Sequence, residues 1–283
     1  MLQTKPQTRF DYGHRVERVM AYIADHLDED LSLDKLAEIA CFSPYHFHRI
    51  YRSIAGETVA DTVRRLRLHR AAGELARSAY PIERIARRAG YGSVEAFTRA
   101  FGSGHGEPPG AFRARFTPFQ PFGTGDDIMI PVKVRQFDGV HLATVAHRGD
   151  YHEIGKAFDK LGVWAATRGL FDRPRRMIGI YYDDPESVPQ AQLRSEAGLE
   201  VDPAMSLDDG IVLRHIPAGR VATIVHKGPY TGLEEVYRQL YCGWLPGSGE
   251  EASDQPAFEQ YLNNPRDTPP SELLTEVNLP LRG

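Results

Sequence analysis

The sequence of 283 residues predicts two domains. The N-terminal domain is expected to be all-α, with two helix-turn-helix motifs joined by a long helix. The C-terminal domain is expected to be α+β, built from a duplicated strand-helix unit around a central ligand groove. Three observations predict this fold class. Segments 31–52 and 80–101 repeat one helical pattern, and segments 134–161 and 213–240 repeat one pattern of two strands and a helix. A stretch rich in proline, glycine and threonine separates the two pairs.

The repeats and the composition divide the chain into four parts. We expect a leader at 1–11, the double helix-turn-helix domain at 12–116, a linker at 117–128 and the second domain at 129–283. A chain of this length can bury two separate hydrophobic cores.

Apolar residues at helical spacing and cap signals predict the helices of the first domain. Expected are a helix at about 14–27, one from the Ser32 cap to Ala40, one from the Ser43 cap to about Ile54, a long connector at 59–78 capped by Thr58, one between Pro81 and Gly90, one after the Ser93 cap, and a last turn ending near Arg115. The buried positions expected in the second helix of each repeat are Phe47, Ile50, Ile54, Phe97 and Phe101.

The second helix of each repeat has a polar, partly basic outer face. The side chains expected to point outward are Tyr45, His48, Arg49 and Arg52 in the first repeat and Val94, Glu95, Thr98 and Arg99 in the second. Residues 1–118 hold 18 Lys and Arg against 14 Asp and Glu, whereas residues 119–283 hold 16 against 24. Because nucleic acid is a dense polyanion, this arginine-rich half favours DNA as its partner.

The first half resembles the DNA-binding region of the AraC family of bacterial transcription regulators. The matching segments are LSLDKLAEIACFSPYHFHRIYR, PIERIARRAGYGSVEAFTRAF and GEPPGAFR. The resemblance implies that both second helices enter the major groove of promoter DNA and that the eight outward residues read bases. Arg49 and Arg99 are expected to bond guanine, and Arg52 is expected to contact a phosphate.

The second repeat departs from the family pattern at Gly102–Gly106. The sequence GSGHG stands where the family has basic and aromatic residues, so side chains that could reach phosphates are missing. Interior glycines also cost about 1 kcal/mol each relative to alanine. We therefore expect the first motif to carry more of the affinity for DNA.

Five strand-like runs follow in the second half: IPVKVRQF, HLATVAHR, MIGIYYDD, GIVLRHI and RVATIVHKG. Its two repeats align at a constant offset of 79, which pairs Arg135 with Arg214 and Tyr151 with Tyr230. We expect the two units to pair about a pseudo-twofold axis and to leave a groove between them.

Two segments of the second half are distinctive: HKGPYTGLEEVYRQLYCGWL and PAFEQYLNNPRDTPPSELLTEVNLPL. On them the second half resembles the GyrI-like domain, a small-molecule-binding module of multidrug-sensing regulators, and the whole chain resembles regulators of Rob-like architecture. A groove lined by aromatics and one carboxylate would suit a hydrophobic or cationic effector. The effector-binding residues expected are Tyr151, Trp164, Tyr181, Tyr230, Trp244 and Glu276, with Glu276 pairing the cation.

The sequence therefore favours a transcription regulator that is not an enzyme. Its expected partners are double-stranded promoter DNA, a small-molecule effector and RNA polymerase. Two alternatives stay open for the second half: a hydrolase of a reactive small molecule with Glu276 as general base, and a protein-interaction module without a ligand. No catalytic residues are expected.

Other features bear on cofactors and location. His46 and His48 lack a second pair at ligand spacing, so neither a metal site nor a cofactor is expected. No run approaches 18 apolar residues, so we expect no membrane partner. Only two cysteines occur, Cys41 and Cys242, and the first residues lack an apolar signal segment, so a cytoplasmic location is expected.

Overall fold

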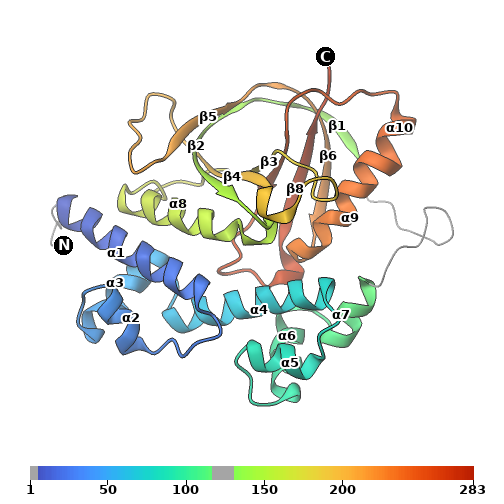
Figure 1. The fold of residues 1–283 in the computed structure, drawn as a ribbon. Coiled ribbons are helices and arrows are strands. Elements are labelled where there is room, and N and C mark those ends of the chain that lie inside the picture. The colour runs from blue at the N-terminus through green and yellow to red at the C-terminus, as the bar shows by residue number, and fades with distance from the viewer. Residues whose placement is uncertain (1–5, 117–130) are drawn as a thin grey trace. The chain divides into compact units, whose positions relative to one another are not determined.

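The structure, a computed structural model, describes residues 6–116 and 131–283, without the side chains of residues 6–10 and Tyr45. The expected linker at 117–128 lies outside the described residues. The chain divides into two units: Met1–Arg115 with Phe158–Pro174, and Phe116–Ala157 with Arg175–Gly283. An N-terminal helical region is followed by a C-terminal region rich in strands, as the sequence predicts (Figure 1).

The N-terminal region consists of helices only. They are α1 (Pro6–Asp25), α2 (Leu33–Ile39), α3 (Pro44–Ala55), α4 (Val59–Arg77), α5 (Ile82–Arg88), α6 (Val94–His105) and α7 (Pro109–Arg115). α1 begins at Pro6 rather than at His14, so part of the expected leader is helical. The residues before His14 lack an apolar stripe, and periodicity therefore could not reveal this first stretch of helix.

The predicted helix starts after Ser32, Ser43 and Ser93 are confirmed. Each serine hydroxyl accepts a hydrogen bond from the backbone NH three residues on, at 3.4, 3.4 and 3.2 Å respectively. This bond satisfies one of the backbone donors that have no partner within the first turn. Gly56 and Gly106 end α3 and α6 at φ of 78° and 77°, a left-handed conformation that favours glycine.

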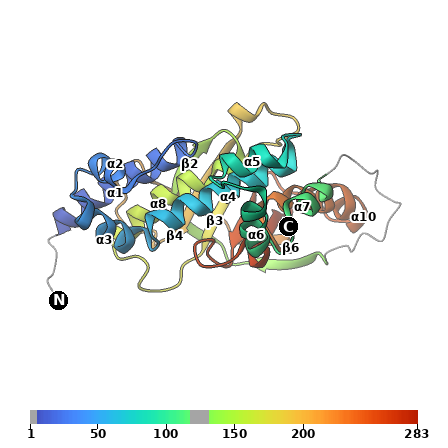
Figure 2. The ribbon, with the colours of Figure 1, turned by 90° about the horizontal axis from the view of Figure 1, so that it is seen from below.

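Buried side chains from α1, α2 and α3 form the first hydrophobic core. The apolar stripe of α1 packs there with Leu36 and Phe47, all at most 8% exposed. Tyr51 is fully buried, and its hydroxyl donates to Thr62 on α4 at 2.9 Å. Ile50 and Ile54, which we expected to be buried, are only partly buried. In Figures 1 and 2, α4 runs between α1–α3 and α5–α7.

Helix α6 continues through Gly102 and Gly104 because its last residue is anchored. His105 is 6% exposed; its ring stacks on Phe101 at 3.9 Å, and Phe112 of α7 meets it edge-on at 5.4 Å. Phe97 and Phe101 are fully buried, as predicted. Burial lowers the pKa of His105 to about 4, so the ring is neutral at neutral pH.

The C-terminal region forms one antiparallel sheet in the order β1-β6-β8-β7-β3-β4-β2-β5. Its strands are β1 (Lys133–Phe137), β2 (Val140–Arg148), β3 (Met177–Tyr181), β4 (Arg194–Glu200), β5 (Val212–Ile216), β6 (Gly219–Lys227), β7 (Ala257–Tyr261) and β8 (Leu274–Pro280). The order is unchanged, apart from its direction, when β1–β4 are exchanged for β5–β8. β3 and β7 pair at the centre, where Gly179 lies opposite Glu259.

Five of these strands coincide with the predicted runs to within one residue at their start or lie inside them, and β8 contains Glu276. β4 and β7 were not among the predicted runs, because RSEAGLE and AFEQY carry charged, small and polar residues that strands usually avoid. β4 is nonetheless almost wholly buried. Tertiary pairing has overridden local preference at both places.

Helical segments complete the C-terminal region. They are η1 (Tyr151–Glu153), α8 (Gly155–Thr167), η2 (Gln190–Gln192), η3 (Tyr230–Gly232), α9 (Leu233–Arg238), a π-helical turn η4 (Gln239–Trp244), α10 (Leu245–Ser248) and η5 (Pro270–Glu272). Leu233, Val236 and Leu240 pack from α9 and η4 onto β6 and β8. None of the helices within the described residues is long and apolar enough to cross a membrane.

The buried neutral His105 predicts acid-sensitive stability. Its pKa is about 6.5 when unfolded and about 4 in the fold, so stability is full above pH 6.5 and is lost as the pH falls towards 4. We expect His105→Phe to remove this loss, which is at most roughly 3 kcal/mol. Thermal unfolding of the full chain between pH 4 and 7.5 measures it, with the exposed His48→Phe as control. Identical pH profiles for wild type and His105→Phe would contradict the prediction.

Candidate effector site and nucleic-acid interface

The outer faces of α3 and α6 present most of the residues expected to read DNA. His48, Arg49 and Arg52 are exposed on α3, and Glu95 and Arg99 are exposed on α6. Val94 and Thr98 are partly buried, and the side chain of Tyr45 lies outside the described part of the chain. The first face is thus the more basic of the two.

Glu95 makes the α6 face less attractive to a polyanion. Its carboxylate lies in the first turn, where backbone and Ser93 hydrogen bonds, with a further contribution from Arg99, lower its pKa. Glu95 and Arg99 are four residues apart and therefore neighbours on one side of the helix. The negative charge beside Arg99 opposes its attraction to phosphates.

A buried carboxylate, Glu259, lies at the centre of the sheet in the C-terminal region. It is 3% exposed and sits on β7, directly opposite Gly179 of β3. The Tyr261 hydroxyl donates to its carboxylate at 2.9 Å, and the Tyr181 and Tyr261 hydroxyls are 2.7 Å apart. Because the Tyr261 proton is directed to Glu259, Tyr181 is the donor to Tyr261, which gives a short chain of hydroxyls ending on the carboxylate.

Further tyrosine rings flank this chain on both sides. Tyr151 meets Tyr181 edge-on at 4.9 Å, and Tyr230 meets Tyr261 edge-on at 5.5 Å. Tyr151 and Tyr230 occupy equivalent positions in the two repeats, and so do Tyr181 and Tyr261 at an offset of 80. The four rings form a row across the β3–β7 pair.

Gly179 makes room for the two central rings. A Cβ atom at this position would lie 2.8 Å from the Tyr261 hydroxyl and 2.9 Å from the Tyr181 ring. Real side chains almost never approach so closely, so any larger residue would displace the tyrosines. The close packing over Gly179 therefore depends on the absence of a side chain.

Burial controls the protonation of this cluster. It raises the pKa of Glu259 to about 7, while the tyrosine hydroxyls oppose the shift by stabilising the charged form. Burial and the nearby carboxylate raise the pKa of Tyr181, Tyr237 and Tyr261 well above the usual value, so these hydroxyls remain protonated donors. The Tyr237 hydroxyl on α9 is buried and makes no hydrogen bond of normal geometry within the described residues.

Three of the six expected effector residues meet in this row: Tyr151, Tyr181 and Tyr230. The Tyr151 hydroxyl is already committed, since it donates to the Asp183 carbonyl at 2.8 Å, which leaves only its ring for a ligand. Trp244 packs against the core between α9 and the sheet. Trp164 is 4% exposed, with the Arg168 guanidinium 4.6 Å above its ring.

Glu276, which we expected to pair with a cationic effector, has a cationic partner within the chain. Arg135 forms an ion pair with it and also donates to Asn278 at 3.2 Å. The other repeat has the equivalent pair, in which Arg214 donates to Glu196 at 2.9 Å. A pair present in both halves fits a structural role, in which each arginine reaches across one strand of the sheet.

The carboxylate that lacks such a pair, Glu259, was missed in the sequence. A signal was present: at an offset of 80, IGIYYDDP aligns with FEQYLNNP, which pairs Tyr181 with Tyr261 and Gly179 with Glu259. Glu259, whose equivalent is a glycine, stands two residues from Tyr261, one of the paired tyrosines. Alternation along the strand would then have placed all of them on one face.

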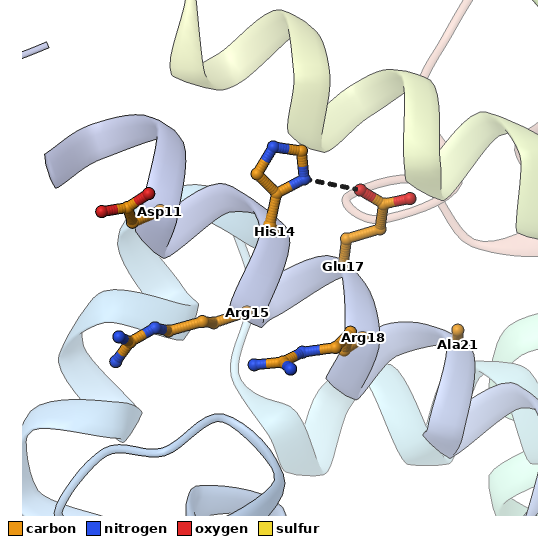
Figure 3. Close-up of a pocket in the computed structure, with 6 residues that line it drawn as sticks. All are labelled: Asp11, His14, Arg15, Glu17, Arg18 and Ala21. Carbon is orange, nitrogen blue, oxygen red and sulfur yellow. Dashed lines mark ion pairs between the residues drawn. The ribbon is translucent and has the colours of Figure 1, made fainter. Parts of the chain in front are cut away.

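Two other features of the described residues do not form a comparable site. A hollow of about 640 Å³ runs along α1 (Figure 3); it is lined by Asp11, His14, Arg15, Glu17, Arg18 and Ala21. All of its lining side chains come from one helix, and His14 and Glu17 pair there at 3.7 Å. Within the described residues, no three His, Cys, Asp or Glu side chains are placed to share a metal ion.

Comparison with known proteins gives matches to both halves. The family model described as "GyrI-like small molecule binding domain" matches residues 130–282, and one described as "Helix-turn-helix domain" matches residues 36–115. The regulatory protein SoxS of Escherichia coli K12 is 32% identical over 100 residues, which cover 35% of this chain and 94% of SoxS.

Two longer relatives match over a smaller share of their length. The uncharacterized HTH-type transcriptional regulator YbfP of Bacillus subtilis 168 is 38% identical over 109 residues, covering 38% of this chain and 37% of YbfP. The transcriptional regulator Rob of Salmonella typhimurium LT2 is 30% identical over 127 residues, covering 45% and 42% respectively. The chain thus spans less than half of YbfP and Rob. It belongs to the family of the GyrI-like small molecule binding domain, here preceded by a helix-turn-helix domain of the AraC type.

Proposed function

We propose that this chain is a sequence-specific, DNA-binding transcription regulator whose C-terminal domain binds a small hydrophobic cation. The observation that carries the effector half of the proposal is Glu259, a buried carboxylate held by tyrosine hydroxyls. A charge of this kind is costly to bury unless a partner neutralises it. A cationic ligand would supply that partner, and RNA polymerase is a further partner of the whole regulator in this proposal.

The DNA-binding half of the proposal rests on two similar helix pairs, α2–α3 and α5–α6, which we interpret as two helix-turn-helix motifs. In each pair the exposed face of the second helix would enter the major groove. α4 has 19 residues and would be about 28 Å long. That length is close to one turn of duplex, about 34 Å, so both second helices can meet successive major grooves on one side of the DNA.

The effector half of the proposal rests on the symmetric strand order and the tyrosine row. We interpret the sheet as a duplicated unit in which the two copies meet at β3 and β7 and form the binding groove between them. Aromatic faces attract cations, and Glu259 adds the opposite charge. The hydroxyls of Tyr181, Tyr237 and Tyr261, which act on the pKa of Glu259, would orient the ligand around that carboxylate.

One observation also favours hydrolysis as a second function. A carboxyl whose pKa lies near 7 can accept or donate a proton at neutral pH, and tyrosine hydroxyls lie beside it. Glu259 would then replace Glu276 as the general base. The binding role proposed above predicts that a bound cation is recovered chemically unchanged after prolonged incubation with the protein. That result would exclude turnover of the compound, and we expect it.

Loss of Arg49 should weaken DNA binding more than loss of Arg99. Arg49 lies on the more basic face, whereas Glu95 is beside Arg99. We expect Arg49→Ala to cost roughly 1–3 kcal/mol of binding free energy and Arg99→Ala to cost less. Titration at fixed salt against a duplex selected by the wild-type protein from a random library measures both. The exposed Arg64→Ala on α4 controls for the lost charge, and equal losses at Arg49 and Arg99 would refute the ranking.

Removal of the Glu259 charge should abolish pH-dependent cation binding. In the wild type, a cation has to displace a proton below pH 7, so affinity should fall by up to tenfold per pH unit below 7 and stay level above it. Glu259→Gln should bind weakly at every pH. Calorimetric titration with aromatic quaternary ammonium and phosphonium ions, and with neutral analogues of the same shape, gives these profiles.

Glu276→Gln is the matched control, since it removes the same charge but from the pair with Arg135. We expect it to retain the pH profile. If Glu276→Gln abolished cation binding while Glu259→Gln kept it, the assignment of the carboxylate would be reversed. If no cation in the panel raised the melting temperature of the wild-type protein, a protein-interaction role without a ligand would gain support.

A further inference from the structure

A cluster of arginines and carboxylates ties both helix pairs to one face of α4. Arg67, Arg70 and Glu74 lie three and four residues apart, so all three side chains project from the same side of the helix. Arg67 and Arg70 contact the α1–α2 loop, residues 26–32, which leads into the first helix pair. Arg70 and Glu74 contact the end of α5, the first helix of the second pair.

Arg67 lies between the α1–α2 loop and the turn that follows α5. Its guanidinium donates to the carbonyls of Leu27 and Glu29 at 2.9 and 3.0 Å. On its other side is Gly90, where a Cβ atom would lie 2.6 Å from the guanidinium. Gly90 also has a φ of +84°, a left-handed conformation that favours glycine, and a side chain there would have to displace the guanidinium.

Asp28, in the α1–α2 loop, joins two further arginines. Arg70 donates to one carboxylate oxygen at 2.7 Å, and Arg88, the last residue of α5, donates to the other at 3.3 Å. Arg70 also donates to the Arg88 carbonyl at 2.7 Å, and Arg88 pairs with Glu74 at 3.1 Å. One carboxylate is therefore shared by the connector helix and the second helix pair.

These arginines are engaged within the protein and not displayed for DNA. The side chains of Arg70 and Arg88 are 22% and 33% exposed, and their guanidinium groups bind carboxylates and carbonyls of the same unit. A single surface ion pair contributes little, but a network in which planar guanidinium groups serve several acceptors restrains orientation. The network is placed where movement of one helix pair relative to the other would break it.

We propose that the cluster of Asp28, Arg67, Arg70 and Arg88 fixes the relative rotation of the two helix pairs, and that this makes the protein select DNA by the number of base pairs between two half-sites. Asp28 is the positioning residue of the cluster. The inference rests on the proposed function, in which α3 and α6 enter successive major grooves. Each added base pair moves the second half-site by about 3.4 Å and turns it by about 35°.

The test compares half-site spacings in variants of the full chain. The probe is a duplex that the wild-type protein selects from a random library and whose two half-sites are located by footprinting. Derivatives carry one base pair more or fewer between the half-sites. We expect the wild type to bind them on the order of tenfold more weakly. Asp28→Asn should cut that ratio at least threefold, because the loosened pairs can adapt to the altered spacing.

Asp30→Asn is the matched control, with the same change of charge in the same loop and an exposed side chain. Arg88→Gln, with the adjacent exposed Arg87→Gln as its control, repeats the test if Asp28→Asn does not fold. An unchanged spacing ratio in the Asp28 and Arg88 variants, with affinity lowered equally on every duplex, would overturn the inference but leave DNA binding intact. A failure to select any duplex would instead overturn the proposed function together with the inference.

Discussion

The hydrogen-bonded pairing of β3 with β7 is the interaction on which the C-terminal site depends. It joins the two halves of the sheet and sets Gly179 opposite Glu259. Side chains alternate between the two faces of a strand, so a slip of one residue would carry Glu259 to the other face, away from Tyr181. The burial of the carboxylate, its raised pKa and the row of tyrosines all follow from this one register.

Comparison of the two halves separates structural charges from the candidate binding charge. Glu196 and Glu276 occupy equivalent positions, and each has an arginine partner from an outer strand. Glu259 has a glycine as its equivalent and tyrosine hydroxyls as its neighbours. A buried carboxylate with its own arginine holds strands together. A buried carboxylate without a cation nearby is costly to ionise, and a cationic ligand would lower that cost. Symmetry within the chain thus serves as an internal control.

Local signals in the sequence located most of the helical half, apart from the first residues of α1. Serine and threonine caps with apolar periodicity located α2, α3, α4 and α6 closely, because these features act within one or two turns of a helix. β4 and β7 were not predicted because their polar residues are buried only through pairing with strands that are distant in the sequence. The carboxylate of the candidate effector site was not predicted from the sequence for a related reason. Tyr151, Tyr181 and Tyr230 were chosen as aromatics, but only the β3–β7 register reveals which acidic residue they surround.

The pairing of Gly179 with Glu259 has a consequence for the dose response of the proposed regulator. A duplicated sheet offers two equivalent positions for a carboxylate, but only the second repeat has one, Glu259. At the equivalent position of the first repeat, Gly179 has no side chain, and the rings of Tyr181 and Tyr261 occupy the space above it. Each polypeptide would then take up a single cation. With one site per chain there is no second site to cooperate with, so occupancy of an isolated chain would rise hyperbolically with effector concentration, giving a graded output instead of a threshold.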